Sequence, residues 1–322
     1  MYKLTIALMT FNRLGNALQV IDVVSKLIKT RSDINFLIVA EKVDDPNTWE
    51  RLNALQQTHW FELIDGKGKG FSGAFFSSII YSNSEYCLHL SDEDSIYPAA
   101  LDDLIKSLDI SNPDLFVCNY EINKSPSKPI KYRSNNSGII LFSDIFSLYH
   151  NPGMIWKISS SKKIFDLYYK TWAERFPQLL LYYPHLLLAL HLMPNKKSFF
   201  YNKTISYQMR FDQNQHSLSR NRKYSHFSSR ILQYFEIEDC LLFLKNDTTL
   251  NERHTRFYKN SLRYLHKIFF MYVITHFSSS NMNRDINYTH GFVSYLLPYF
   301  FFRKNFFRIK NFFAKLFYLL QK

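Results

Sequence analysis

The first third of the chain alternates between two spacings of apolar residues. Short apolar runs with the length of buried strands occupy residues 4–9, 34–40, 60–64, 86–90 and 115–119. Apolar positions at helical spacing occupy residues 16–28, 48–57, 72–81 and 98–108 between them. Strands that alternate with helices of this length predict an α/β fold with a doubly wound, mostly parallel sheet.

A polar segment follows each of the first four predicted strands at its carboxyl end. These segments are residues 10–13, 41–45, 65–70 and 91–94. Ligands of doubly wound sheets bind outside the carboxyl ends of the strands, where such loops meet. We therefore expect a ligand site built from these four loops.

Asp92, Glu93 and Asp94 are the sharpest chemical feature, three carboxylates directly after an apolar run. A divalent cation offsets their mutual repulsion well, and Mn²⁺ and Mg²⁺ prefer oxygen ligands. Alternate residues of a strand point to one side, so Asp92 and Asp94 are predicted to share one ion. The alternative is a structural role, in which the acidic residues favour the dipole of the helix that begins near Pro98.

The order and spacing of these loops resemble the donor half of family-2 glycosyltransferases, which have the GT-A fold. The matching pieces are residues 10–13, residues 41–45, the glycine-rich turn and helix at 66–78, and the strand 86–90 that runs into residues 92–94. The resemblance covers about the first 120 residues well and the remainder weakly. It implies an inverting transferase that takes a nucleoside-diphosphate sugar as donor and uses Mn²⁺ or Mg²⁺.

The resemblance also implies roles for individual residues of the donor half. Asp94 is the main metal ligand, with Asp92 beside it. Glu41 or Asp44 contacts the base or ribose, and the loop that begins at Gly66 passes near the nucleoside. The residues expected in the donor site are Thr10, Asn12, Arg13, Glu41, Asp44, Gly66, Gly70 and Asp92.

The acceptor half departs from the family pattern. Family members usually carry an acidic pair at the start of an acceptor-side helix, and the corresponding segment, residues 182–190, has none. An inverting transferase still needs a general base near the acceptor hydroxyl, and Glu174 and His185 are the two candidates. The alternatives are a solvated helix face for Glu174 and a core position for His185.

Residues 211–222 contain a further polar group. GT-A enzymes often bring a late histidine and basic residues to the metal and the diphosphate. His216 fits the place of that histidine as a metal ligand, and Arg220 and Arg222 are predicted to hold phosphate oxygens. A polar surface loop is the alternative.

The charge of the chain is divided between its two parts. Residues 1–120 contain 10 Lys and Arg against 16 Asp and Glu, whereas residues 121–322 contain 30 against 11. A basic second part indicates contact with something anionic, such as phosphate or a membrane surface. We expect a GT-A domain over residues 1–225, with a donor half at 1–120 and an acceptor half at 121–225, and a helical C-terminal region over 226–322.

The pattern of residues 300–322 favours a membrane surface. On a helix, Phe302, Phe306 and Phe313 share a stripe flanked by Arg and Lys side chains, which is typical of helices in an anionic interface. A terminal helix packed on the core is the alternative. Three scattered cysteines favour a reducing cytoplasm, and no apolar run is long enough to predict a spanning helix. We therefore expect a peripheral protein on the inner face of the cytoplasmic membrane.

These observations predict a glycosyltransferase of bacterial capsule, O-antigen or similar surface-polysaccharide synthesis. Its expected partners are a nucleotide sugar, a lipid-linked glycan acceptor and an anionic membrane. The oligomeric state is left open. Nucleic acid is not expected as a partner, because aromatic–basic RNA-binding motifs are absent from the sequence. One alternative is a sugar nucleotidyltransferase, although its basic, glycine-rich loop after the first strand is missing. The other is a non-catalytic basic membrane- or RNA-binding protein, which leaves the acidic first part unexplained.

Overall fold

The protein was analysed as a computed structural model. It describes residues 2–67, 70–122, 130–132, 137–140, 151–194, 197–208, 227–246, 252 and 254–265. The described residues of Met1–Asn221, with Asn251–His254, form one compact unit, and those of Arg222–Leu250 and Thr255–Lys322 form a second. The predicted boundary at residue 225 and the predicted tail helix at 300–322 lie outside the described residues and stay predictions.

The described strands belong to one mixed sheet, in which most neighbours of the donor half are parallel. The strands are β1 (Tyr2–Thr10), β2 (Ile34–Ala40), β3 (Glu62–Asp65), β4 (Ser84–Ser91), β5 (Asp94–Ile96), β6 (Leu115–Ile122), β7 (Ile130–Tyr132), β8 (Gly138–Ile139), β9 (Met154–Lys157) and β10 (Ser198–Gln208). Their order is β3-β2-β1-β4-β9-β6-β10-β5, with β7 beside β6 and β8 beside β10. β3, β2, β1 and β4 run parallel, β9 is antiparallel to both neighbours, and β5 is antiparallel to β10. The predicted doubly wound sheet is confirmed.

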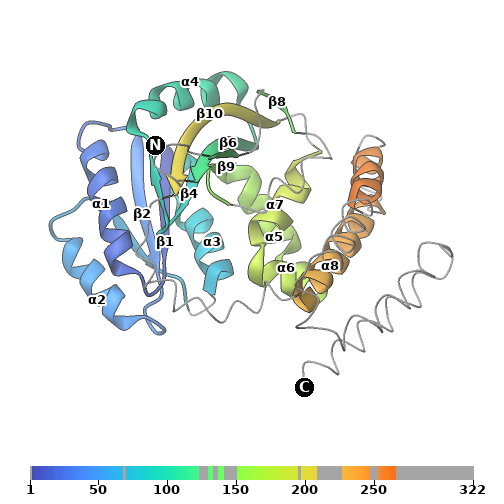
Figure 1. The fold of residues 1–322 in the computed structure, drawn as a ribbon, viewed down its shortest axis with the longest axis horizontal. Helices are drawn as coiled ribbons and strands as arrows, with labels where there is room; N and C mark the ends of the chain where they lie inside the picture. The colour runs from blue at the N-terminus through green and yellow to red at the C-terminus, as the bar shows by residue number, and fades with distance from the viewer. Residues whose placement is uncertain are drawn as a thin grey trace. The chain divides into compact units, whose positions relative to one another are not determined.

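Helices cover both faces of this sheet, as Figure 1 shows. The helices of the first unit are α1 (Leu14–Ile28), α2 (Pro46–Leu55), α3 (Gly70–Tyr81), the short 3₁₀ helix η1 (Pro98–Ala100), α4 (Leu101–Ser111), α5 (Ile158–Arg175), α6 (Pro177–Tyr182) and α7 (Pro184–Leu192). A further helix, α8 (Phe227–Lys245), belongs to the second unit. α3 contacts β1 to β4 on one face, together with α5, α6 and α7, whereas α1 and α4 cover the other. None of the described helices is long and apolar enough to cross a membrane.

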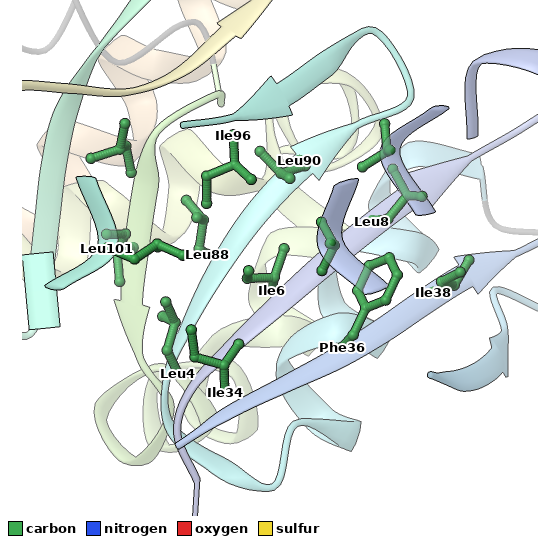
Figure 2. Packing of buried hydrophobic residues seen from close by; sticks show 14 of the residues in the cluster. Leu4, Ile6, Leu8, Ile34, Phe36, Ile38, Leu88, Leu90, Ile96 and Leu101 are labelled. Carbon is green, nitrogen blue, oxygen red and sulfur yellow. The ribbon is translucent and has the colours of Figure 1, made fainter. Parts of the chain in front are cut away.

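The core between the sheet and α1 and α4 fixes the register of the strands. Alternate residues of β1, β2 and β4 point into it, among them Ile6, Phe36 and Leu88, and each is at most 1% exposed (Figure 2). A slip of one residue would turn this whole set to the other face of the sheet, against α3 and α5, and would break the packing on both faces, so the core also fixes which residues end each strand. The three cysteines are buried and form no disulfide bond.

The segment after β6 contains a short strand for which the apolar pattern of the sequence gives no prediction. Glu121 and Ile122 complete β6, and Ile130–Tyr132 return as β7, antiparallel to it. The short strand escaped prediction because Ser, Asn, Pro and Lys dominate the residues around it.

Candidate functional site

The carboxyl ends of four parallel strands meet at one edge of the sheet, as predicted. Thr10 at the end of β1 lies beside Ala40 of β2, which in turn pairs with Asp65 of β3, and Met9 pairs with Ser91 of β4. Residues 10–13, 41–45, 65–67 and 91–94 therefore gather at this edge, and the site is built from them.

The acidic residues form a tight turn between β4 and β5. The backbone N–H and the hydroxyl of Ser91 both donate to Asp94 Oδ2, at 3.1 and 2.7 Å, and Glu93 N donates to Ser91 Oγ at 3.2 Å. These bonds end β4 at Ser91 and begin β5 at Asp94. The expectation that Asp92 and Asp94 project from one continuous strand is therefore wrong, because Ser91 closes a turn between them.

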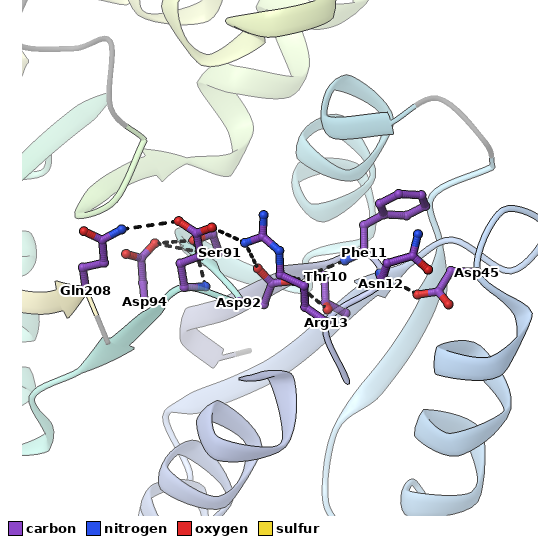
Figure 3. Close-up of polar contacts among 10 residues, drawn as sticks. Thr10, Phe11, Asn12, Arg13, Asp45, Ser91, Asp92, Asp94 and Gln208 are labelled. Carbon is purple, nitrogen blue, oxygen red and sulfur yellow. Dashed lines mark hydrogen bonds and ion pairs between the residues drawn. The ribbon is translucent and has the colours of Figure 1, made fainter. Parts of the chain in front are cut away.

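Asp92 is held by the loop that follows β1 (Figure 3). Its Oδ2 accepts from the Thr10 hydroxyl at 2.9 Å and from Phe11 N at 3.3 Å, and its Oδ1 accepts from Arg13 Nη1 at 3.1 Å. Arg13 Nη1 also forms an ion pair with Glu93. Thr10 and Arg13, predicted to line the nucleotide pocket, thus tie this loop to the acidic turn.

Asp94 is a buried carboxylate of the turn that has no cationic partner among the described residues. Asp92 and Asp94 are 5% and 3% exposed. Burial raises the pKa of Asp92 to about 6 against the opposing effect of Arg13, and raises the pKa of Asp94 to about 7 against the opposing bonds from Ser91. Within the described ranges no Lys, Arg or His nitrogen lies within 4.0 Å of the Asp94 carboxylate.

This charge balance favours a cation beside Asp94, although the described residues offer few other ligands. Among them, no group of three or more His, Cys, Asp or Glu side chains is arranged to hold a metal. Both oxygens of Asp92 already accept hydrogen bonds, and His216 lies outside the described residues. An ion here fits an open site, with one carboxylate from the protein and the remaining positions left to phosphate oxygens and water.

Asp45 anchors the other side of the loop after β1. Asn12 has a left-handed backbone (φ 54°), and its N–H donates to Asp45 Oδ2 at 2.7 Å. The second oxygen of Asp45 accepts from Thr48 N at 3.3 Å and so caps α2. Sequence reasoning named the neighbouring Asp44, which is exposed. The signal that identifies Asp45 is Pro46, the first residue of a helix whose cap must precede it.

Replacing Asp45 with Ala should therefore have two effects. We expect α2 to lose its cap at a cost of about 1 kcal/mol in the free energy of unfolding. We also expect weaker nucleotide binding, because the Asn12 loop loses its anchor. Urea unfolding and nucleotide titration measure the two effects. Asp45→Asn keeps one acceptor oxygen, so it can retain one of the two bonds and should lose less in total than Asp45→Ala. Equal losses in the two variants would contradict this role.

Glu41 and Gly66 form the wall of the site at β2 and β3. Gly66 N donates to Ala40 O at 2.9 Å, which brings the Gly66 backbone against the buried Glu41 carboxylate. A Cβ on Gly66 would lie only 2.8 Å from Glu41 Cδ. Gly70 begins α3 with a left-handed backbone (φ 58°) and is exposed. The structure thus brings both glycines and Glu41 to the predicted edge.

Gln208 lies on the opposite side of the acidic turn, and no pattern in the sequence predicts it. It pairs with Asp94 across β10 and β5, and its Nε2 donates to Glu93 Oε2 at 3.3 Å. Arg220 and Arg222, the predicted phosphate ligands, lie outside the described residues.

The two candidate bases occupy different environments. Glu174 is exposed in the last turn of α5. His185 is the second residue of α7 and is 2% exposed. Its ring lies edge-on to Phe71 and Phe75, with ring centroids 5.9 and 6.2 Å away. This is the core position that the sequence left as an alternative, and we propose no catalytic role for His185.

The same aromatic core buries His89 completely, beside Ser78 Oγ at 2.6 Å. Burial, helped by nearby His185, lowers the pKa of His89 to about 3. In the unfolded chain the histidine pKa is about 6.5. Below that pH the unfolded chain binds a proton at His89 that the folded chain does not. The stabilisation from neutral His89 is complete above that value and is lost as pH falls toward 3.

We therefore expect the difference in unfolding free energy between the parent protein and His89→Gln to become smaller in acid. The difference in unfolding free energy should shrink by about 2 kcal/mol between pH 7 and pH 5. Urea unfolding of both proteins at the two pH values measures this difference, in which the titration of Asp92 and Asp94 cancels. A gap that stays constant would contradict the buried neutral state of His89.

Comparison with known proteins agrees with this architecture. No family model and no curated protein matches the sequence. The mixed sheet, with an acidic turn at the carboxyl edge of its parallel strands, is the GT-A fold, as predicted. Among solved structures, residues 1–349 of S. aureus TarS match with a TM-score of 0.58 and 14% identity, covering 87% of this chain and 73% of that one.

Two further structures of TarS show the same likeness. TarS 1–349 in complex with UDP-GlcNAc matches with a TM-score of 0.58 and 14% identity over 81% of this chain and 70% of that chain. The longer TarS structure matches with a TM-score of 0.57 and 14% identity over 87% of this chain, but over only 44% of its own length. Similarity at this level of identity concerns the fold.

Proposed function

We propose that the protein is an inverting glycosyltransferase that moves a sugar from a nucleoside-diphosphate donor to a hydroxyl group. The observation that carries the proposal is the buried acidic turn at the carboxyl edge of a GT-A sheet, with Asp94 uncompensated by any described cation. The complex of TarS with UDP-GlcNAc supports it, because a protein of this fold binds such a donor.

The geometry suggests a division of work within the donor site. The loop anchored by Asn12 and Asp45 and the wall of Glu41 and Gly66 would contact the nucleoside. Asp94 would hold Mn²⁺ or Mg²⁺, an ion that supplies charge stabilisation for the departing diphosphate. Arg13 fixes Asp92 and Glu93 in place.

We further propose a lipid-linked glycan of a bacterial surface polysaccharide as the acceptor, reached from the inner face of the cytoplasmic membrane. The amphipathic pattern of residues 300–322 and the basic second part of the chain support this proposal. His216, Arg220 and Arg222 remain the predicted ligands of the metal and the diphosphate, and Glu174 remains a predicted base.

The phosphate product tests the reaction class. The protein is incubated with UDP-, GDP-, CDP- and dTDP-sugars and a bacterial membrane fraction as the source of acceptor, and in parallel with the four nucleoside triphosphates and sugar 1-phosphates. The released phosphate compound is identified in each case. We expect a nucleoside diphosphate from one nucleotide series. Pyrophosphate would instead assign the protein to the sugar nucleotidyltransferases, and the absence of any product with all four series would remove the support for a transferase.

A further inference from the structure

Two tyrosines and a glutamate form a polar and aromatic cluster at the end of β5, β6 and β10, next to the acidic turn. The Tyr97 hydroxyl donates to Glu121 Oε2 at 3.0 Å, and the rings of Tyr97 and Tyr207 lie 4.7 Å apart at an angle of 36°. Tyr207 and Glu121 are paired residues of neighbouring parallel strands. All three side chains are partly exposed.

The strand register places this cluster one residue from the donor site. Gln208 pairs with Asp94, and the next residue of β10, Tyr207, pairs with Ser95. One residue along a strand is about 3.3 Å. The β6 residues Phe116 and Cys118 belong to the core under α1 and α4, so Glu121 points to the opposite face, on which α3 and α5 pack.

The side chains of the cluster retain unused binding capacity. Glu121 accepts one hydrogen bond, from Tyr97, and has no ion pair with any described residue. Burial, together with this bond, raises the pKa of Tyr97 to about 12, so its hydroxyl stays protonated as the donor. No described side chain bonds the Tyr207 hydroxyl, which therefore faces solvent. Two adjacent rings with a carboxylate at their edge match a ligand that has both C–H faces and hydroxyl groups.

We propose that Tyr97, Glu121 and Tyr207 form a subsite for a neutral sugar of the acceptor, the C–H face of the sugar lying on the tyrosine rings and its hydroxyl groups donating to Glu121. This inference rests on the proposed function. A neutral sugar suits this position because its hydroxyl groups can donate to the Glu121 carboxylate, whereas a carboxylate repels an anionic group. The donor sugar is the competing occupant, and the test below distinguishes it.

Direct binding tests the subsite without requiring turnover. Saturation-transfer NMR is recorded on the full chain with methyl glycosides of glucose, galactose and N-acetylglucosamine, with and without UDP. We expect signals from at least one glycoside, reduced at least fivefold in Tyr207→Ala and in Glu121→Gln. Tyr201→Ala is the matched control, because Tyr201 lies on the same strand and packs on Phe116 at 5.2 Å, away from the site. It should leave the signals unchanged.

The proposal would be overturned if the parent protein gave no glycoside signal or if all variants gave equal signals. A loss in Tyr201→Ala as large as in Tyr207→Ala would also overturn it. A Tyr207→Ala variant that binds UDP normally but binds UDP-GlcNAc less tightly would place the donor sugar at the cluster and also overturn it. Failure of the parent protein to bind any of UDP, GDP, CDP and dTDP contradicts the proposed function instead, and is visible separately from the glycoside signals.

Discussion

Asp94→Asn should abolish sugar transfer, lowering kcat/KM by at least about a hundredfold, while the protein stays folded. The asparagine oxygen can still accept both bonds from Ser91, so the turn between β4 and β5 is retained. Replacing a carboxylate that is 3% exposed also removes a buried charge, so stability should stay level or rise. Initial rates with the donor found active and urea unfolding at pH 7 measure the two expectations.

Asp114→Asn is the matched control for this change. Asp114 also accepts a serine hydroxyl bond, from Ser160 at 2.6 Å, but it precedes β6 and lies away from the carboxyl edge. Its replacement should leave transfer within about twofold of the parent. Full activity of Asp94→Asn would rule out the role assigned to Asp94, and unfolding of that variant would show that the carboxylate is structural.

Gly66→Ala should destabilise the protein by about 1–3 kcal/mol and sharply weaken nucleotide binding. The new methyl group would lie against the Glu41 carboxylate, 2.8 Å from its Cδ, and Glu41 is buried with little room to move. Either Glu41 or the backbone of residue 66 must shift, and both line the proposed nucleoside wall. Urea unfolding and titration with the nucleoside diphosphate measure the two losses.

Gly15→Ala provides the control, because a Cβ there meets nothing within 4 Å and the residue lies in α1. This change should stabilise the protein by about 0.5 kcal/mol. Glu41→Ala in the Gly66→Ala background should recover stability lost to the clash, although not nucleotide binding. If Gly66→Ala behaves like Gly15→Ala, the close approach of Gly66 to Glu41 is wrong.

The predictable part of the fold is the part in which periodicity is strong and contacts are local. β1, β2 and β4 were found because their apolar runs are continuous, and α1 because its apolar positions recur at helical spacing. From these strands the position of the site at the carboxyl edge follows directly. The GT-A fold was expected from a different source, the resemblance of the loops, in their order and spacing, to the donor half of family-2 glycosyltransferases.

The partners within the site were not predictable, because they come from distant positions in the chain. Gln208 reaches Glu93 across 115 residues, and this contact depends on a β5–β10 pairing that no local pattern reveals. Arg13 contacts Asp92 only because β1 and β4 are neighbours in the sheet. Asp45 differs, since Pro46 marks it as a helix cap and a closer reading of the sequence would have selected it over Asp44.

The most direct test of the donor site is a thermal-shift screen of UDP, GDP, CDP and dTDP, each with and without Mn²⁺. A ligand that binds only the folded state stabilises it and so raises the melting temperature. At a ligand concentration of a hundred times Kd the stabilisation is about 2.7 kcal/mol. We predict stabilisation by one diphosphate, dependent on Mn²⁺ and absent in Asp94→Asn. No shift with any diphosphate, or an equal shift in Asp94→Asn, would contradict a nucleotide-sugar site at the acidic turn.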